Sequence, residues 1–254
     1  MPPRLVYLVR HAEGHHNINW AHYIRDPDLT DKGHNQCQTL AANFPYHSRI
    51  TTVLCSPLKR TIQTTLESFH PAISRLADGN PSFKIITNPY VQETGEWECD
   101  IGTKVPELQE WFGNYASENP ESKGYAYREA LDFSIVESDV PEWPQKEGKF
   151  AASKVAARAE VAREYLFDNF GEDEELVIVS HGGFLHYLTD DWADYDESMG
   201  TAWSNTDWRS YEVTKGEDGK VKLVEKQRGR ELHSIDGKET EKAEVEAGGH
   251  NSKV

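Results

Sequence analysis

Two short, uninterrupted apolar runs constrain the fold of this chain more than any other feature of its sequence. Residues 5–9 read Leu-Val-Tyr-Leu-Val, and residues 176–179 read Leu-Val-Ile-Val. Each run is too short for a helix and lacks the apolar–polar alternation of a strand with one face in water. Continuous apolar strands are typical of parallel sheets that helices cover on both faces, so we expect both runs at the centre of such a sheet.

The first 190 residues alternate between strand-like and helix-like segments. Residues 50–55, rich in β-branched side chains, and residues 83–87 form two further candidate strands. Helical composition marks residues 30–43, 59–69 and 149–170. Strands that alternate with helices predict an α/β fold, a three-layer sandwich in which helices flank a mostly parallel central sheet.

Residues 97–148 interrupt this alternation with four prolines, three tryptophans and three tyrosines. We interpret the segment as an aromatic insertion over the sheet and its active site, within a single domain of residues 1–230. Its aromatic side chains would either form a small core of their own or contact an apolar or cationic group of a ligand, and the sequence leaves both open. Residues 231–254 are charged and contain no aromatic residue, which predicts a flexible tail.

The charge balance limits the partners of the chain. It has 43 Asp and Glu residues against 27 Lys and Arg residues, a formal net charge of −16 at pH 7. Such a chain should repel nucleic acid and anionic membrane surfaces, whose binding depends on clustered Lys and Arg. No apolar run approaches the roughly 18 residues of a membrane span. We therefore expect a small-molecule ligand, held in a local basic pocket if it is anionic; no feature indicates an oligomeric state.

The three cysteines point to a reducing compartment. Cys37, Cys55 and Cys99 are odd in number and scattered, which argues against a disulfide framework and against a cysteine-based zinc site. The N-terminal residues enter the first strand without the features of a secretory signal. Together these observations favour a cytoplasmic protein.

Basic side chains follow both central strands at the point where each strand ends. Arg10 and His11 follow the first run, and His181 follows the second, before the glycines Gly182 and Gly183. In open α/β sheets, ligands bind beyond the carboxyl ends of the strands. If the two strands are neighbours, both imidazoles face one crevice, and the paired glycines let the backbone approach a ligand closely.

A third strand end delivers an arginine to the same edge. Ser56 and Pro57 follow the candidate strand at residues 50–55, and proline suits the first position of a helix. Arg60 would then lie in the first helical turn. Taken alone, Arg60 could be an ordinary solvated arginine, and His11 an ordinary strand-end histidine.

Together these residues resemble the signature of the histidine phosphatase superfamily, also called the phosphoglycerate mutase-like family. Four motifs in their usual order carry the resemblance: Arg10-His11-Ala12-Glu13 with Asn17, Ser56-Pro-x-x-Arg60-x-x-x-Thr64, Val91-Gln92-Glu93, and Ser180-His181-Gly182. The similarity runs from about residue 4 to about residue 190. It is strongest to small fungal-type phosphatase members, which also carry a segment like the Cys-Asp-Ile-Gly at residues 99–102.

The resemblance implies that His11 is a nucleophile that accepts a phosphoryl group. Only neutral imidazole can attack, and the guanidinium groups of Arg10 and Arg60 would favour that form by lowering the pKa of His11. The same two arginines would clamp the phosphate and neutralise the charge of the transition state.

The resemblance also implies the remaining parts of the site. His181, protonated in the phosphate-bound state, would be a further catalytic donor to the phosphate, with Asn17 and the backbone of Gly182 as weaker donors. Glu93 would be the general acid, which requires a carboxyl group whose pKa is raised towards neutrality. Asp100 remains an alternative for that role.

We expect neither a metal nor a cofactor. His15, His16 and His22 lie close to His11 in sequence, but no short-spaced carboxylate or cysteine completes a recognisable ligand set. Residues 94–100 are acidic and lack the basic, tyrosine-containing stretch of the mutases. The sequence therefore predicts a metal-independent phosphomonoesterase that hydrolyses a small phosphorylated metabolite through phosphohistidine. The alternatives are non-phosphoryl chemistry in specialised metabolism and a catalytically idle phosphate-binding module.

Overall fold

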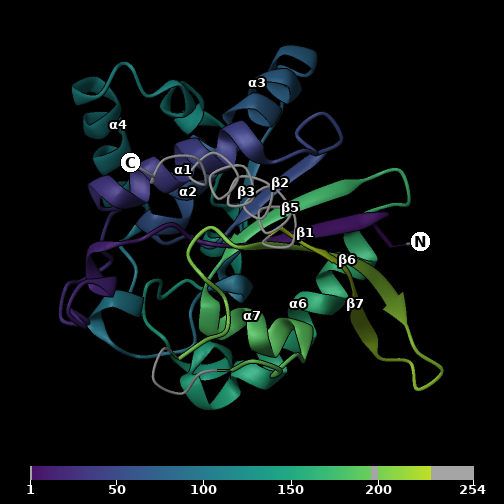
Figure 1. Ribbon diagram of the computed structural model, residues 1–254. Coiled ribbons are helices and arrows are strands. Elements are labelled where there is room, and N and C mark those ends of the chain that lie inside the picture. Colours follow the sequence, from purple (N-terminus) through teal and green to yellow (C-terminus); the bar gives the residue numbers. More distant parts are fainter. Residues whose placement is uncertain (1, 196–199, 230–254) are drawn as a thin grey trace, which may run out of the picture.

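The computed structural model describes residues 2–195 and 200–229 (Figure 1), and the predicted tail at residues 231–254 lies outside them. In the described residues, seven strands form one sheet in the order β4-β3-β2-β5-β1-β6-β7. The strands are β1 (Leu5–Arg10), β2 (Thr52–Cys55), β3 (Ile85–Thr87), β4 (Leu131–Asp132), β5 (Glu175–Ser180), β6 (Trp208–Lys215) and β7 (Val221–Arg228).

The two apolar runs form the centre of this sheet, as predicted. Strand β5 pairs in parallel with β1 on one side and with β2 on the other, so that Ile178 lies between Leu8 and Leu54. All six residues of β5 are buried. Burying each such aliphatic side chain stabilises the fold by roughly 2 kcal/mol, which is why these runs occupy the middle of the sheet.

The sheet is parallel from β4 to β1 and antiparallel beyond it. Strand β6 pairs antiparallel with β1, and β7 returns beside β6 as a hairpin. Buried side chains alternate with exposed ones in the first half of β7, as expected for an edge strand with one face in water.

Helices cover both faces of the sheet, which confirms the three-layer arrangement. In Figure 1, α1 to α4 lie above the sheet and α6 and α7 below it. The helices are α1 (Asp31–Asn43), α2 (Lys59–Ser68), α3 (His70–Gly79), α4 (Val105–Glu118), α5 (Ser134–Asp139), α6 (Val155–Asn169) and α7 (Gly182–Thr189). None of the helices in the described residues could cross a membrane.

Short 3-10 helices make up much of the connecting chain. They are η1 (His15–Asn17), η2 (Pro89–Val91), η3 (Glu98–Asp100), η4 (Lys123–Ala130), η5 (Gly148–Phe150) and η6 (Ala152–Lys154). Cys37, Cys55 and Cys99 are buried free thiols.

The segment at residues 97–148 is part of the main core. Phe112, Tyr125 and Trp143 are buried in the same apolar cluster as the central strands, and β4 joins the sheet beside β3. Most of its aromatic side chains therefore stabilise the domain. Trp97 is the exception, because 64% of its side chain is exposed.

Candidate active site

Three parallel strands end at one place in the structure. In the sheet register Arg10 lies opposite Ser180, and Cys55 lies opposite Val179, so the residues that follow β1, β2 and β5 lie at the same edge. The rings of His11 and His181 are 5.2 Å apart between centroids, and both side chains are buried. The strand order thus brings together the two histidines that the sequence singled out.

The environment of His11 keeps its imidazole neutral. Nδ1 lies 2.7 Å from the main-chain oxygen of Ala12. A carbonyl can only accept, so Nδ1 is the protonated nitrogen and Nε2 carries the lone pair. Burial, and then the positive charges of Arg60 and Arg10, hold the pKa of His11 well below its usual value. A nucleophilic nitrogen is therefore present at neutral pH.

Backbone carbonyls hold the two arginines, and the Nε–H group of each is left as a donor without a partner among the described residues. Arg60, fully buried in the first turn of α2, donates from Nη1 to Cys99 O at 2.6 Å, and Arg10 donates from Nη1 to Trp203 O at 2.5 Å. In the described part of the chain, the Nε atom of each is buried without a hydrogen-bond partner. Burial lowers the pKa of Arg10 to about 10, so it remains charged at neutral pH.

Thr64 of the second motif joins the first strand end to helix α2. Its hydroxyl accepts a hydrogen bond from Ala12 N at 3.0 Å and donates one to Arg60 O at 2.6 Å. This link fixes the distance between His11 and the turn that carries Arg60. It gives a physical reason for a threonine four residues after that arginine.

His181 precedes α7 and contacts the loop after β2. Its Nε2 lies 2.8 Å from Ser56 Oγ, and its Nδ1 is buried with no partner within the described residues. Burial first, and then the charge of Arg60, hold the pKa of His181 well below its usual value. His181 is therefore neutral in this structure, and the protonated form that we expected needs a bound anion to favour it.

Glu93 lies against the N-terminus of α7. Its Oε1 accepts hydrogen bonds from Thr94 N at 2.8 Å and from Phe184 N at 3.1 Å. A Cβ atom at Gly183 would stand only 2.7 Å from Oε1. The second glycine of the pair therefore makes room for this carboxylate, a role that the sequence did not predict.

Asp100 lies in the same loop but is engaged differently. Its Oδ1 forms a salt bridge with Arg60 Nη2 at 3.1 Å, and both side chains are buried. Gly95 lets the loop fold back on itself, because a Cβ atom there would clash with the other oxygen of Asp100. Asp100 is thus the ion-pair partner of Arg60.

Two buried cations that the sequence analysis missed hold the Glu93 loop. Arg158 of α6 donates to Gln92 O at 2.6 Å and to Glu93 O at 3.1 Å. Lys146 donates to Glu93 O at 2.9 Å and to Gly95 O at 2.5 Å. No local motif surrounds either cation, and only the folded loop shows their partners.

His16, and not Asn17, contacts His11. The His16 ring is buried 5.4 Å from the His11 ring, whereas Asn17 is exposed and uses its Oδ1 to accept a hydrogen bond from Gly14 N. Burial, and then the charges of Arg60 and Arg10, lower the pKa of His16 to about 2.

The backbone of Gly182 packs closely against the side chain of Thr201, which belongs to a later loop. A Cβ atom at Gly182 would stand 2.8 Å from the Oγ1 and Cγ2 atoms of Thr201. That loop also supplies Asn205, whose Nδ2 donates to His11 O at 2.9 Å. No signal in the sequence marked Asn205.

A metal centre is not formed by the histidines near His11. Across residues 2–195 and 200–229, no group of three or more His, Cys, Asp or Glu side chains has the arrangement of a metal site. His15 pairs with Asp28 at 3.8 Å, away from the buried His16.

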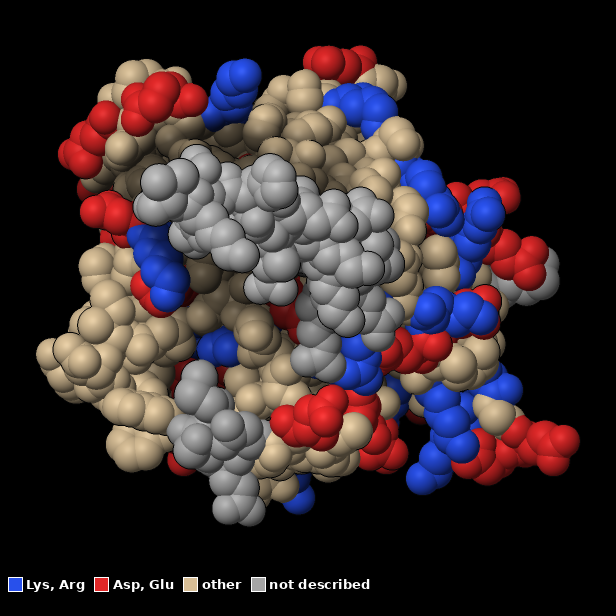
Figure 2. Space-filling model, in the orientation of Figure 1, with Lys and Arg blue, Asp and Glu red and all other residues tan. Residues whose placement is uncertain are grey.

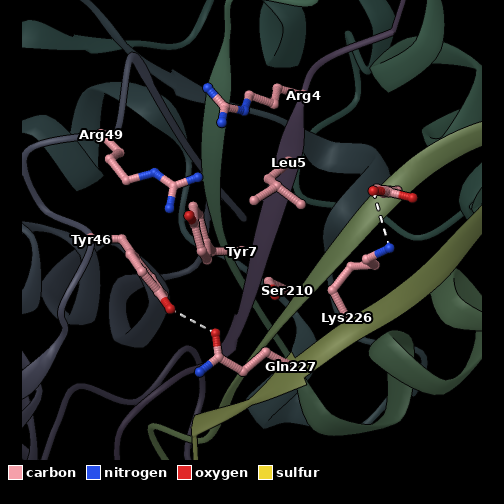
Figure 3. Close-up of a pocket in the computed structure, with 9 residues that line it drawn as sticks. Arg4, Leu5, Tyr7, Tyr46, Arg49, Ser210, Lys226 and Gln227 are labelled. Atoms are coloured by element: carbon pink, nitrogen blue, oxygen red, sulfur yellow. Dashed lines mark hydrogen bonds and ion pairs between the residues drawn. The ribbon is translucent and has the colours of Figure 1, made fainter.

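A separate pocket lies at the other end of β1 (Figure 3). Its volume is about 350 Å³, and it is lined by Arg4, Tyr7, Tyr46, Arg49 and Lys226, among others. Two of its basic side chains already form ion pairs: Arg49 with Glu175 at 2.7 Å, and Lys226 with Glu212 at 3.1 Å. Arg4 and Leu5 lie at the N-terminal end of β1, whereas His11 follows its carboxyl end.

The fold and site define an α/β sandwich with a buried cationic site at the carboxyl ends of its parallel strands. The family model of the histidine phosphatase superfamily (branch 1) matches residues 6–132 and 96–226. The chain therefore belongs to the histidine phosphatase superfamily, as its motifs indicated.

Curated relatives and solved structures extend this similarity. The chain is 26% identical over 215 residues to phosphoglycerate mutase-like protein 1 of Arabidopsis thaliana. This alignment covers 72% of this chain and 70% of that protein. It is 27% identical over 186 residues to a protein of Schizosaccharomyces pombe named as a probable phosphatase. This second alignment covers 70% of this chain and 74% of the S. pombe protein. A solved structure named mycobacterial hydrolase 1 aligns with a TM-score of 0.46 at 16% identity, which covers 88% of this chain and 97% of that one.

Proposed function

We propose that the chain is a phosphomonoesterase that hydrolyses a small phosphorylated metabolite through phosphohistidine at His11, without a metal ion. The observation that carries this proposal is the neutral Nε2 of His11 beside two arginines whose buried Nε atoms have no partner among the described residues. Family membership and the S. pombe relative named as a probable phosphatase support it.

In the first step, Arg10, Arg60 and His181 hold the phosphate oxygens. The lone pair of His11 Nε2 attacks phosphorus opposite the ester oxygen, so that an N–P bond forms as the P–O bond breaks. The cationic groups neutralise the charge that builds up on the equatorial oxygens, which is the largest contribution such a site makes. The carboxyl proton of Glu93 passes to the departing alcohol oxygen.

In the second step, water replaces the alcohol. The Glu93 carboxylate takes a proton from the water as its oxygen attacks phosphorus, and the N–P bond breaks with return of the lone pair to His11. Inorganic phosphate leaves, and Glu93 is again protonated for the next cycle. The three cations serve unchanged in both steps, because the charge they meet is the same.

The contacts of the two acidic candidates favour Glu93 over Asp100 as the acid. Asp100 forms a buried salt bridge with Arg60, and a buried pair loses much of its stability when one partner is neutralised. Among the described residues, Glu93 has no such bond to a cationic side chain; its Oε1 accepts hydrogen bonds from the backbone amides of Thr94 and Phe184. Protonation of Glu93 therefore leaves the phosphate clamp intact.

A reducing, cytoplasmic location is part of this proposal. The buried free thiols of Cys37, Cys55 and Cys99 support it, because disulfides are rare in reduced compartments. Two other activities stay as alternatives: non-phosphoryl chemistry on the same scaffold, and phosphate binding without turnover.

Release of inorganic phosphate from an alkyl phosphate, in the presence and absence of EDTA, tests the proposal. We expect the same rate in both, since His11 and the three cations need no ion. A loss of activity that Zn²⁺ or Mg²⁺ restores would contradict the mechanism. Binding of phosphate without any turnover would favour the idle module.

A further inference from the structure

Exposed aromatic side chains gather beside the candidate active site. Trp20 is 63% exposed and Trp97 is 64% exposed, although most tryptophans of a folded domain lose the greater part of their surface to the core. The two come from segments more than seventy residues apart in the sequence. An exposed apolar patch of this kind indicates a binding surface.

His22 joins the two indoles into one surface, which we call the aromatic rim: Trp20, His22 and Trp97. The His22 ring lies 5.6 Å from the Trp20 ring and 5.5 Å from the Trp97 ring, measured between centroids. These spacings are those of aromatic rings in contact. The rim therefore presents a continuous run of ring faces and edges.

The rim is one residue removed from the phosphate clamp. The main-chain oxygen of His22 accepts a hydrogen bond from Cys99 N at 3.0 Å, and Cys99 O accepts one from Arg60 Nη1 at 2.6 Å. Trp97 lies in the loop that begins with Glu93. The rim and Arg60 are thus joined through the backbone of one residue, Cys99, which places the rim beside the candidate site.

The backbone at Trp20 is strained. Asn19 and Trp20 have φ angles of 52° and 55°, in the left-handed region that non-glycine residues rarely adopt. Such a conformation is unfavourable for a residue with a side chain and is found most often at functional sites. Hydrogen bonds keep the turn in place, among them His22 N to Trp20 O at 2.7 Å.

The charged side chains beside the rim include one matched pair. Arg25, on the same loop as Trp20, pairs with Glu98 at 3.6 Å. In Figure 2 the surface on the left of the view, where the early loop after β1 lies in Figure 1, is mostly neither acidic nor basic. This surface suits a neutral ring better than a second anionic group.

We propose that the aromatic rim binds a planar aromatic group in the alcohol part of the substrate, so that the enzyme prefers phosphate monoesters of aromatic alcohols. This inference rests on the proposed function and names its substrate class. The aromatic side chains in the core of residues 97–148 take no part, because they are buried.

Three esters separate a planar ring from general apolarity. They are 2-naphthylmethyl phosphate, cyclohexylmethyl phosphate and ethyl phosphate, which have alcohols of similar leaving ability. For the full-length chain we expect kcat/KM to be at least about fivefold higher for the naphthylmethyl ester than for the cyclohexylmethyl ester. A planar aromatic ring can stack on an indole, whereas a puckered cyclohexyl ring cannot.

Variants of the rim test which residues carry the preference. Trp20→Ala and Trp97→Ala should each bring the ratio of the two esters close to one, mainly through KM, and Trp97→Phe should restore part of it. Val224→Ala, which removes an exposed apolar side chain from β7, should keep the ratio of the parent chain. Circular dichroism checks the fold of each variant.

Two outcomes would overturn the inference. If the parent chain hydrolyses all three esters but does not prefer the aromatic one, the rim has no role in selection and the proposed function stands. The same holds if the alanine variants lower kcat/KM equally for all esters. If the parent chain hydrolyses none of them, the proposed function itself fails.

Discussion

Lys146 Nζ donates a hydrogen bond to the main-chain oxygen of Glu93 at 2.9 Å. The lysine is buried, and that burial lowers its pKa to about 8. A buried ammonium group is costly unless it is well paired, so its two backbone bonds are the reason it can occupy this position. It therefore serves as a positioning residue that holds the Glu93 loop.

Replacing this lysine should slow the protonation of the leaving group. Lys146→Met keeps a similar stem and removes the donor, so we expect kcat for an alkyl phosphate to fall on the order of 10-fold to 100-fold as the carboxyl group shifts. Nitrophenyl phosphate, whose alcohol leaves without a proton, should be affected less. Steady-state kinetics on both esters measure this.

Lys149→Met is the matched control, because it removes a lysine whose side chain is 54% exposed. It should leave both rates near those of the parent chain. An equal loss for both esters in Lys146→Met would mean that the lysine acts on the phosphate or on the fold and not through Glu93.

Gly183 offers a second way to move the same carboxylate. Gly183→Ala places a Cβ atom 2.7 Å from Glu93 Oε1, so the carboxylate must shift, and we expect kcat to fall about tenfold or more. Gly113→Ala in α4 is the control, since its Cβ atom would meet nothing within 4 Å. It should raise the free energy of unfolding by roughly 0.5–1 kcal/mol. Urea unfolding of both variants would expose the alternative, a Gly183→Ala chain that is simply unfolded.

The centre of the fold could be predicted because its strands are buried on both faces. The apolar runs that became β1 and β5 needed no knowledge of their neighbours, and the polar residues that follow them mark the sheet edge. The hairpin of β6 and β7 was missed. Its signal is weaker: an Asp218-Gly219 turn, and in the first half of β7 buried side chains only at every second position, Val221 and Leu223.

Apart from Glu93 and Asp100, which were named through the family resemblance, the candidate site was predictable only near strand ends. His11 and His181 follow such ends directly, and Arg60 lies one helical turn beyond another. Lys146 and Arg158 lie in segments with no motif, and they reach Glu93 through backbone carbonyls, which any sequence supplies. His16 could have been recognised only from the burial of its ring.

The three buried histidines of the candidate site should make stability depend on pH. His11, His16 and His181 all have pKa values held below the usual value near 6.5 by burial and by Arg60. Below pH 6.5 the unfolded chain binds protons at these positions that the folded chain does not. The free energy of unfolding should therefore fall as the pH drops below 6.5, by up to about 1.4 kcal/mol per pH unit for each histidine.

Urea unfolding at pH 7.5, 6.5 and 5.5 measures this slope. His16→Gln removes one of the three groups and should make the dependence shallower, whereas His70→Gln, at a partly exposed position on α3, should not. An unchanged slope in His16→Gln would show that His16 titrates alike in both states.

The division of labour between His11 and Glu93 gives the sharpest test of the mechanism. His11→Ala should abolish both turnover and covalent labelling, because in the proposed mechanism His11 Nε2 is the atom that takes the phosphoryl group. Glu93→Gln should lower turnover of an alkyl phosphate by about 10²-fold to 10⁴-fold, as the loss of a general acid does. With a labelled nitrophenyl phosphate, rapid quench of Glu93→Gln should still trap phosphohistidine, since the first step then needs no acid and water attack is slowed. Asp100→Asn should instead weaken phosphate binding through Arg60 and raise KM. If Glu93→Gln keeps full turnover on the alkyl ester while Asp100→Asn loses it, Asp100 is the acid and the salt bridge with Arg60 must open during catalysis.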